Sequence, residues 1–260
     1  MSSSIAVFDS GIGGLTVVRA LRQTMPHESI VYLGDTARVP YGTKSASTIQ
    51  RYALQAAEAL AASHPKLLIV ACNTASAYGL ESLQKRFAFP VVGVIEAGAR
   101  AALRQDSRIA VLATRATVAS DVYARTLRTL NPSVSIYSLA CPLLVSLVEE
   151  GWWDDPITEE VCHRYLSELP VAVHTVILGC THYPVLLPIL KRLRPDLHWV
   201  DSGTPLAEDI QNILSPLAPQ QSSQERGSLR LWVTDESSRL RELASKFLGE
   251  PAPALELVNL

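Results

Sequence analysis

Two stretches of the sequence share one design: "LLIVACNTAS" at residues 67–76 and "TVILGCTHYP" at residues 175–184. In each stretch a short apolar run ends at a cysteine, Cys72 or Cys180, and polar residues follow it. Continuous apolar runs of this length are typical of parallel strands that helices cover on both faces. Because ligands of open α/β sheets bind at the carboxyl ends of the strands, both cysteines are candidate site residues.

The sequence around these stretches alternates between strand-like and helix-like segments. Further short apolar runs lie at residues 4–9, 29–35 and 90–96. The segments between them are rich in Ala, Leu, Arg and Gln and have a helical character: residues 14–24, 44–63 and 75–87. This alternation predicts βαβ units, and therefore a parallel sheet with helices on both faces.

The same alternation then starts again, displaced along the chain by about 105 residues. "IAVFDS" at 5–10 returns as "IAVLAT" at 109–114, and "GVIEAG" at 93–98 returns as "HWVDSG" at 198–203. "IVYLGD" at 30–35 has a weaker match in "SIYSLAC" at 135–141, and the two cysteine stretches form a fourth pair. Because the four matches keep one order and nearly one offset, we predict an internal duplication.

We therefore expect an α/β fold of two similar parallel-sheet lobes, residues 1–97 and 98–205, with the active site in the cleft between them. The tail, residues 206–260, is expected to join the first lobe, because its one strand (229–235) and two short helices bury too little surface to fold alone. The sequence predicts those helices at 205–214 and near 236–248, with a Pro/Gln/Ser-rich turn at 215–228.

Composition excludes several classes of protein. The 260 residues include 23 basic and 25 acidic ones, so there is no excess of positive charge for binding nucleic acid. No apolar run reaches the ~18 residues that span a membrane. The N-terminal "MSSSIAVFDS" lacks the basic flank and long apolar segment of a secretory signal, so we expect a cytoplasmic protein.

The four cysteines are expected to be reduced thiols in that compartment. There is no C-x-x-C pair, and Cys180 and His182 are too close in sequence for the usual zinc sites, so no metal is expected. Cys141 and Cys162 are interpreted as small buried apolar residues. Cys72 and Cys180, in contrast, should approach one ligand from opposite faces if the two lobes face each other.

Helices are expected to begin at both cysteines, with Thr74 and Thr181 available as caps. The N-terminus of a helix lowers the pKa of a cysteine thiol, and its free N–H groups bind carboxylates. The other polar residues near predicted strand ends are Asp9, Ser10, Asp35, Tyr41, Gly42, Thr114, Thr117, Ser120 and His182. The turn "GIGG" is not a G-x-G-x-x-G motif, because residue 16 is Thr, and nucleotide binding is not expected.

Six motifs taken together resemble those of a known family. They are "FDSGIGGLTV" (8–17), "YLGDTARVPYG" (32–42), "ACNTAS" (71–76), "ATxATxxSxxY" (113–123), "LVEEG" (147–151) and "LGCTHYP" (178–184). In this order they are similar to the motifs of bacterial glutamate racemases, members of the cofactor-independent aspartate/glutamate racemases. The resemblance extends from residue 5 to about residue 210.

The resemblance implies a two-base racemisation of glutamate without any cofactor, which supplies D-glutamate for peptidoglycan synthesis and hence for cell shape. It implies that Cys72 and Cys180 are the acid/base pair, one a thiolate and the other a thiol. Asp9 would assist Cys72, with Asp35 as a weaker member of that group, and His182 with Glu149 would assist Cys180. Glu150 follows Glu149 directly, so either carboxylate is a candidate. The substrate-binding residues implied are Asp9, Ser10, Tyr41, Gly42, Asn73, Thr74, Thr114, Thr117, Thr181 and His182.

Three alternatives stay open from the sequence. The first is an aspartate racemase or a related enzyme on the same scaffold. The second is a non-catalytic two-lobe binder of small anions, and the third is a redox module in which Cys72 and Cys180 form a disulfide. The sequence leaves the oligomeric state open, with a homodimer as one expectation.

Overall fold

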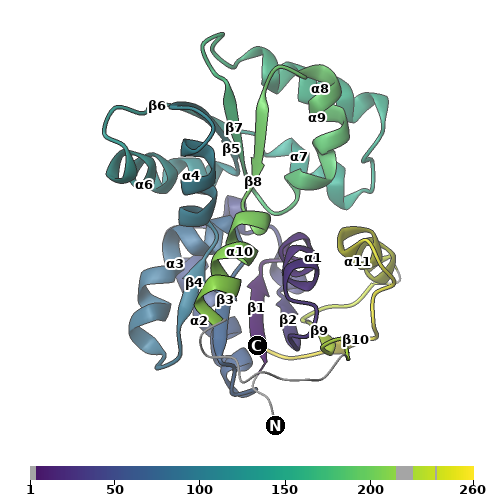
Figure 1. Ribbon diagram of the computed structural model, residues 1–260. Coiled ribbons are helices and arrows are strands. Elements are labelled where there is room, and N and C mark those ends of the chain that lie inside the picture. The colour runs from purple at the N-terminus through teal and green to yellow at the C-terminus, as the bar shows by residue number, and fades with distance from the viewer. Residues whose placement is uncertain (1–3, 215–224, 238) are drawn as a thin grey trace.

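The computed structural model describes residues 4–214, 225–237 and 239–260. It consists of two parallel β-sheets, each accompanied by helices, and Figure 1 shows the second sheet above the first. The expected fold class, α/β with two parallel-sheet lobes, is confirmed.

The first sheet has six strands in the order β10-β9-β2-β1-β3-β4, and every neighbouring pair is parallel. Its bounds are β1 Ile5–Asp9, β2 Ile30–Gly34, β3 Leu67–Val70, β4 Val91–Gly93, β9 Leu229–Val233 and β10 Leu255–Leu257. Successive residues of β1 face opposite sides of the sheet. Ile5 and Val7 belong to one buried apolar cluster and Ala6 and Phe8 to another, which is why this strand is apolar throughout.

The second sheet has four parallel strands in the order β6-β5-β7-β8. Its bounds are β5 Arg108–Ala113, β6 Ser135–Ala140, β7 Thr175–Gly179 and β8 His198–Asp201. The order repeats β2-β1-β3-β4 of the first sheet, so each of the four sequence matches joins two strands at equivalent places. This agreement supports the internal duplication.

The helices lie mostly between successive strands, as the alternation of the sequence predicts. The helices that follow the first four strands are α1 Leu15–Thr24, α2 Ala46–Ala61, α3 Asn73–Arg86 and α4 Ile95–Leu103. The next are α5 Arg115–Ala119, α6 Val122–Leu130, α7 Leu143–Glu149, α8 Pro156–Ser167 and α9 Leu187–Leu193. Short 3₁₀ helices are η1 Thr36–Arg38, η2 Tyr41–Thr43 and η3 Tyr183–Leu186. Among the described residues, no helix has both the length and the apolar character needed to cross a bilayer.

In its described residues, the tail adds two strands and two helices. Strand β9 pairs with β2, and β10, which the sequence did not predict, pairs with β9. Helices α10 (Gly203–Leu214) and α11 (Leu240–Leu248) both pack on α1. Helix α11 begins later than the expected residue 236, and most of the turn expected at 215–228 lies outside the described residues. The lobe boundaries at residues 97 and 205 stay predictions.

Candidate active site

A cavity lies where the carboxyl ends of the two sheets approach each other. Its lining contains most of the residues predicted for the site, from both sheets: Ser10, Tyr41, Gly42, Cys72, Asn73, Thr74, Thr114, Cys180, Thr181 and His182. Val39, Pro40 and Val145 complete the lining and were not predicted. Asp9, Asp35, Thr117, Ser120 and Glu149 are not part of it.

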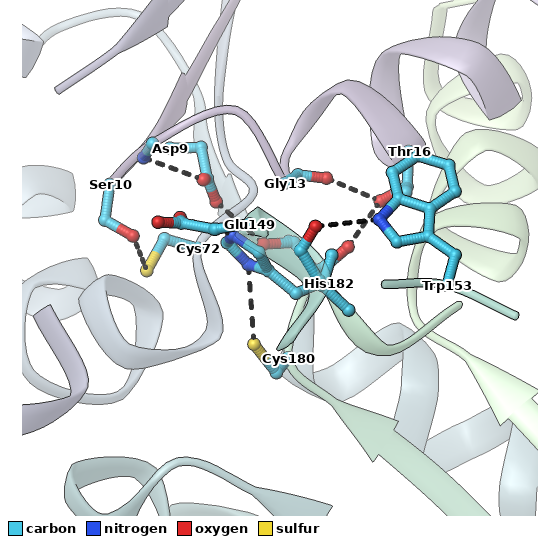
Figure 2. A network of polar contacts seen from close by, with 12 residues as sticks. Asp9, Ser10, Gly13, Thr16, Cys72, Glu149, Trp153, Cys180 and His182 are labelled. Atoms are coloured by element: carbon cyan, nitrogen blue, oxygen red, sulfur yellow. Dashed lines mark hydrogen bonds and ion pairs between the residues drawn. The ribbon is translucent and has the colours of Figure 1, made fainter. Parts of the chain in front are cut away.

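Cys72 lies at the N-terminus of α3 and caps this helix with its own side chain. Its Sγ accepts a hydrogen bond from the backbone N–H of Ala75 at 3.4 Å, and its thiol donates to Ser10 Oγ at 3.3 Å (Figure 2). The expectation that Thr74 caps α3 is therefore wrong. The Thr74 hydroxyl bonds Thr114 and Thr117 instead.

Burial determines the protonation state of Cys72. Burial raises the pKa of the Cys72 thiol to about 12, with a further rise from the nearby charge of Asp9. The hydrogen bonds that Cys72 makes with Ser10 and Ala75 act in the opposite direction. The expectation that the helix N-terminus would lower this pKa is wrong, because the cost of burying a thiolate is larger. At neutral pH Cys72 is therefore a thiol.

Cys180 is the first member of a chain of three side chains. Its Sγ lies 3.8 Å from Nδ1 of His182, and Nε2 of His182 lies 2.9 Å from Oε1 of Glu149 (Figure 2). Burial alone would lower the pKa of His182, but the hydrogen bonds to Cys180 and Glu149 raise it to about 10. At neutral pH His182 is thus an imidazolium that donates to both partners and places a positive charge beside the Cys180 sulfur.

Aromatic side chains shield this histidine from water. The ring of Phe247, on α11, packs edge-on against His182 with 5.7 Å between ring centroids. Trp153 packs in the same manner on Phe247, at 5.2 Å, and its Nε1 donates to the carbonyl of Val148 at 2.7 Å. His182 is 3% exposed as a result, so the last helix of the tail contributes to its surroundings.

The structure distinguishes the two glutamates of "LVEEG". Glu149, at the end of α7, faces His182. The next residue, Glu150, points away and pairs with Arg239 at 3.0 Å, where its side chain is 61% exposed. The geometry therefore places Glu149, and not Glu150, beside the candidate catalytic histidine.

Asp9 links the two lobes behind the cavity. Its fully buried carboxylate accepts hydrogen bonds from the backbone N–H of Gly11 at 3.0 Å and from Oγ1 of Thr181 at 3.2 Å. Burial raises the pKa of Asp9, and the charge of His182 opposes this rise. No hydrogen bond joins Asp9 to Cys72 within the described part of the chain, so its assisting role stays a prediction.

The glycines of "FDSGIGG" allow this close packing. A Cβ atom at Gly13 would lie 2.5 Å from Nδ1 of His182, and one at Gly14 would lie 2.5 Å from Cβ of Asp9. Neither distance is possible for real atoms, so a side chain at either position would displace a candidate catalytic group. The glycine-rich turn thus brings the first lobe against the second.

Three threonine hydroxyls form a hydrogen-bonded cluster at the cavity, in which Thr74 and Thr114 line the cavity and Thr117 does not. Oγ1 of Thr74 lies 2.9 Å from Oγ1 of Thr114 and 3.0 Å from that of Thr117, and the last two are 3.0 Å apart. Thr114 also caps α5 through the N–H of Thr117. Ser120, in contrast, donates to the carbonyl of Thr117 and does not face the cavity.

Asp35 has a different place from the one the resemblance implies. Its buried carboxylate accepts hydrogen bonds from Tyr41 Oη, from Arg38 Nε at 2.6 Å and from Thr234 Oγ1 at 2.9 Å. These contacts hold the segment 36–43, which supplies part of the cavity wall, against the end of β9. The geometry therefore gives Asp35 a structural role in this wall rather than a contact with Cys72.

The hydrogen bonds of Thr234 to Asp35 and Ala37 lead to a prediction about the stability of the protein. Thr234 Oγ1 also accepts the N–H of Ala37 at 3.0 Å, so Thr234→Val would leave two partners without a hydrogen bond. We expect this change to lower the free energy of unfolding by about 1–3 kcal/mol, measured by urea denaturation. Thr234→Ser keeps the hydroxyl and is expected to stay close to the wild type. Equal losses in the two variants would contradict the role of the hydroxyl.

Two buried hydroxyl side chains near the cavity were missed from the sequence. Tyr123, the last residue of "ATxATxxSxxY", donates to Asn73 Oδ1 at 2.6 Å. Its Oη also lies 3.1 Å from Ser202 Oγ. The motif contained the tyrosine, but nothing in the spacing indicated that it contacts a residue of the first lobe. Ser202 gave no signal beyond its position after β8.

The arrangement suits proton transfer at a small molecule. A thiol and a sulfur beside an imidazolium line one cavity and come from different sheets, and all four cysteines are free of disulfides. Among the described residues that line the cavity there is no Lys or Arg, so the donors for an anion are hydroxyls, amides and backbone N–H groups.

Comparison with known proteins agrees with this chemistry. The model of the family "Asp/Glu/Hydantoin racemase" matches residues 15–209. The glutamate racemase of Syntrophus aciditrophicus (strain SB) is 44% identical over 260 residues, covering 98% of this chain and 96% of the relative. The crystal structure of glutamate racemase from Francisella tularensis subsp. tularensis SCHU S4 in complex with D-glutamate superposes with a TM-score of 0.92 at 37% identity, covering 99% of this chain and 97% of that one.

An aspartate racemase is a more distant neighbour. That of Picrophilus torridus superposes with a TM-score of 0.61 at 17% identity, covering 83% of this chain and 95% of that one, and this likeness shows a common fold alone. The extent of the family match and the identity to the Syntrophus aciditrophicus protein decide the family. This chain belongs to the Asp/Glu/Hydantoin racemase family.

Proposed function

We propose that the protein interconverts L- and D-glutamate by a two-base mechanism that needs no cofactor, with Cys72 and Cys180 as the two bases. The observation that carries this proposal is that two cysteine side chains, from equivalent strand ends of the two sheets, line the same cavity. A substrate carbon between them has one sulfur on each face. Relatives named glutamate racemase, one of them in complex with D-glutamate, support glutamate as the substrate.

The proposed reaction transfers one proton on each side of the α-carbon. A cysteine thiolate takes the α-proton, the C–H bond breaks, and its electron pair is shared between Cα and the adjacent carboxylate. The thiol on the opposite face then gives its proton to Cα, so that the configuration inverts. The two sulfurs thereby exchange protonation states, and the reverse reaction restores the first state.

The protonation of Cys72 in the site without substrate supports different roles, acid and base, for the two cysteines at the start of the reaction. The pKa of about 12 for Cys72 makes it the acid, and the other sulfur of the pair, Cys180 beside His182, is then the base. An α-proton next to a carboxylate is a very weak acid, so the charge that develops in the transition state needs donors that are already in position. The hydroxyls of Ser10 and Thr74 and the N-terminus of α3 supply such donors in the cavity wall.

The racemisation is tested by running it in deuterated water without any added cofactor. L-glutamate is expected to give D-glutamate that carries solvent deuterium at Cα, because the acid that delivers the proton has exchanged with solvent. D-glutamate should give deuterated L-glutamate. Bound but unchanged glutamate would indicate the anion binder, and inversion that retains the original hydrogen would contradict the two-base mechanism.

Aspartate racemisation on the same scaffold is the second candidate. A parallel reaction with L-aspartate distinguishes the two, and we expect glutamate to be preferred because the relatives named glutamate racemase are far more similar to this chain than the aspartate racemase is. We further propose that the D-glutamate is made in the cytoplasm for peptidoglycan synthesis. Loss of the enzyme should then make growth of its host depend on added D-glutamate.

A further inference from the structure

Three buried polar side chains beside the cavity form one hydrogen-bonded chain. Asn73 begins α3 in the first lobe, Tyr123 lies on α6 in the second, and Ser202 follows β8 at the start of α10. Tyr123 Oη is 2.6 Å from Asn73 Oδ1 and 3.1 Å from Ser202 Oγ. The three residues are 3%, 3% and 5% exposed, and of the three only Asn73 lines the cavity.

The direction of these hydrogen bonds follows from the available protons. The amide oxygen of Asn73 can only accept, so the single proton of the Tyr123 hydroxyl points to it. The hydroxyl of Ser202 must then donate to the Tyr123 oxygen. Within the described residues the amide nitrogen of Asn73 has no hydrogen-bond partner, and it is left with two protons to donate.

Two glycines leave the space that the side chains of Tyr123 and Ser202 occupy. A Cβ atom at Gly179, the last residue of β7, would lie 3.1 Å from Cε2 of Tyr123. A Cβ atom at Gly98, on α4, would lie 2.7 Å from Oγ of Ser202. The tyrosine ring is thus held by packing against the strand that leads to Cys180, independently of its hydroxyl.

We propose that Tyr123 is a positioning residue for the substrate: its hydroxyl, supported by Ser202, fixes the Asn73 amide so that the NH₂ group donates to a substrate carboxylate in the cavity. The inference rests on the proposed function, because it needs a carboxylate there. Without the Tyr123 hydroxyl, the amide is free to turn about its Cβ–Cγ bond. Turned by half a rotation, it presents its oxygen to the carboxylate, and the two acceptors repel each other.

Tyr123→Phe tests this proposal, because it removes the hydroxyl and keeps the ring that packs on Gly179. We expect KM for glutamate to rise about three- to tenfold, the value of one hydrogen bond, while kcat changes less than KM. In a protein that already carries Asn73→Ala, the added Tyr123→Phe should leave KM unchanged. Ser202→Ala is expected to raise KM in the same direction by a smaller factor.

Tyr78→Phe is the matched control. The Tyr78 hydroxyl also joins the lobes, by donating to the carbonyl of Ala116 at 2.9 Å, but it contacts no polar side chain of the cavity. Its loss should leave KM unchanged. An equal rise in KM for Tyr78→Phe would mean that any weaker contact between the lobes has this effect, and it would overturn the proposal.

Other outcomes separate this inference from the proposed function. If Tyr123→Phe has the KM of the wild type, the positioning role is overturned. The same holds if Tyr123→Phe raises KM by an equal factor with and without Asn73→Ala. In both cases the wild-type protein still racemises glutamate. A wild-type protein that does not racemise glutamate refutes the proposed function instead. If Tyr123→Phe does not fold, Ser202→Ala decides, and an unchanged KM in that variant overturns the inference.

Discussion

Cys72→Ser is expected to lower kcat/KM for racemisation by at least about a hundredfold, and Cys180→Ser is expected to do the same, because a positioned general acid or base supplies ~10²–10⁴ in rate. A serine hydroxyl is a far weaker acid than a thiol, so it neither ionises to accept the α-proton nor donates readily to a carbanion. The rates are measured from optical rotation, starting from each enantiomer.

Cys162→Ala is the matched control for the two serine variants. Cys162, on α8, is also buried, and it does not line the cavity, so its loss should leave the rate of racemisation unchanged. The remaining cysteine of each serine variant can still exchange the proton on its own face. We therefore expect the two variants to incorporate solvent deuterium into opposite enantiomers. Near-wild-type rates in either variant would refute the two-base mechanism.

Glu149→Gln is expected to lower kcat/KM about 10- to 100-fold, because a hydrogen bond to a charged partner contributes ~1.5–3 kcal/mol. The carboxylate helps to raise the pKa of His182 to about 10. Its loss lowers that pKa, and the positive charge beside Cys180 then disappears at a lower pH. In the wild type the rate should fall as pH rises through about 10, and in the variant this fall should begin at lower pH.

Glu150→Gln is the neighbouring control for this change. It removes the same charge one residue away, but Glu150 pairs with Arg239 near the surface. We expect an unchanged rate and an unchanged pH profile. If Glu150→Gln shifts the alkaline side of the profile as far as Glu149→Gln does, the assignment of Glu149 as the partner of the candidate catalytic histidine is wrong.

The architecture was predictable because its central strands, among them β1, β3 and β7, are covered on both faces. Ile5 to Asp9 are fully buried, so the strand appears in the sequence as an unbroken apolar run and not as an alternation. The internal duplication could be recognised in the sequence because buried strands at equivalent places in the two sheets keep similar apolar residues. Strand β10 was not predicted, because it is a three-residue edge strand that is partly exposed and has no such run.

The candidate site was predictable where side chains follow a strand directly, and not where they approach from another part of the chain. Cys72 and Cys180 are found from their strands alone. Tyr123 reaches Asn73 from a helix of the other lobe, and only the packing of the two lobes reveals that contact. The raised pKa of Cys72 was missed for a related reason, since burial is a property of the whole structure and the helix N-terminus is a local one.

The contact between Phe247 and His182 has a consequence for the order in which the protein acquires its activity. Both sulfurs and the histidine are synthesised well before α11, so a nascent chain that ends before residue 240 already contains every proton-transfer group. Its imidazole ring, however, is open to solvent on the side that Phe247 covers. We therefore expect a chain that lacks α11 to be inactive, and catalysis to begin only once this last helix has packed against His182.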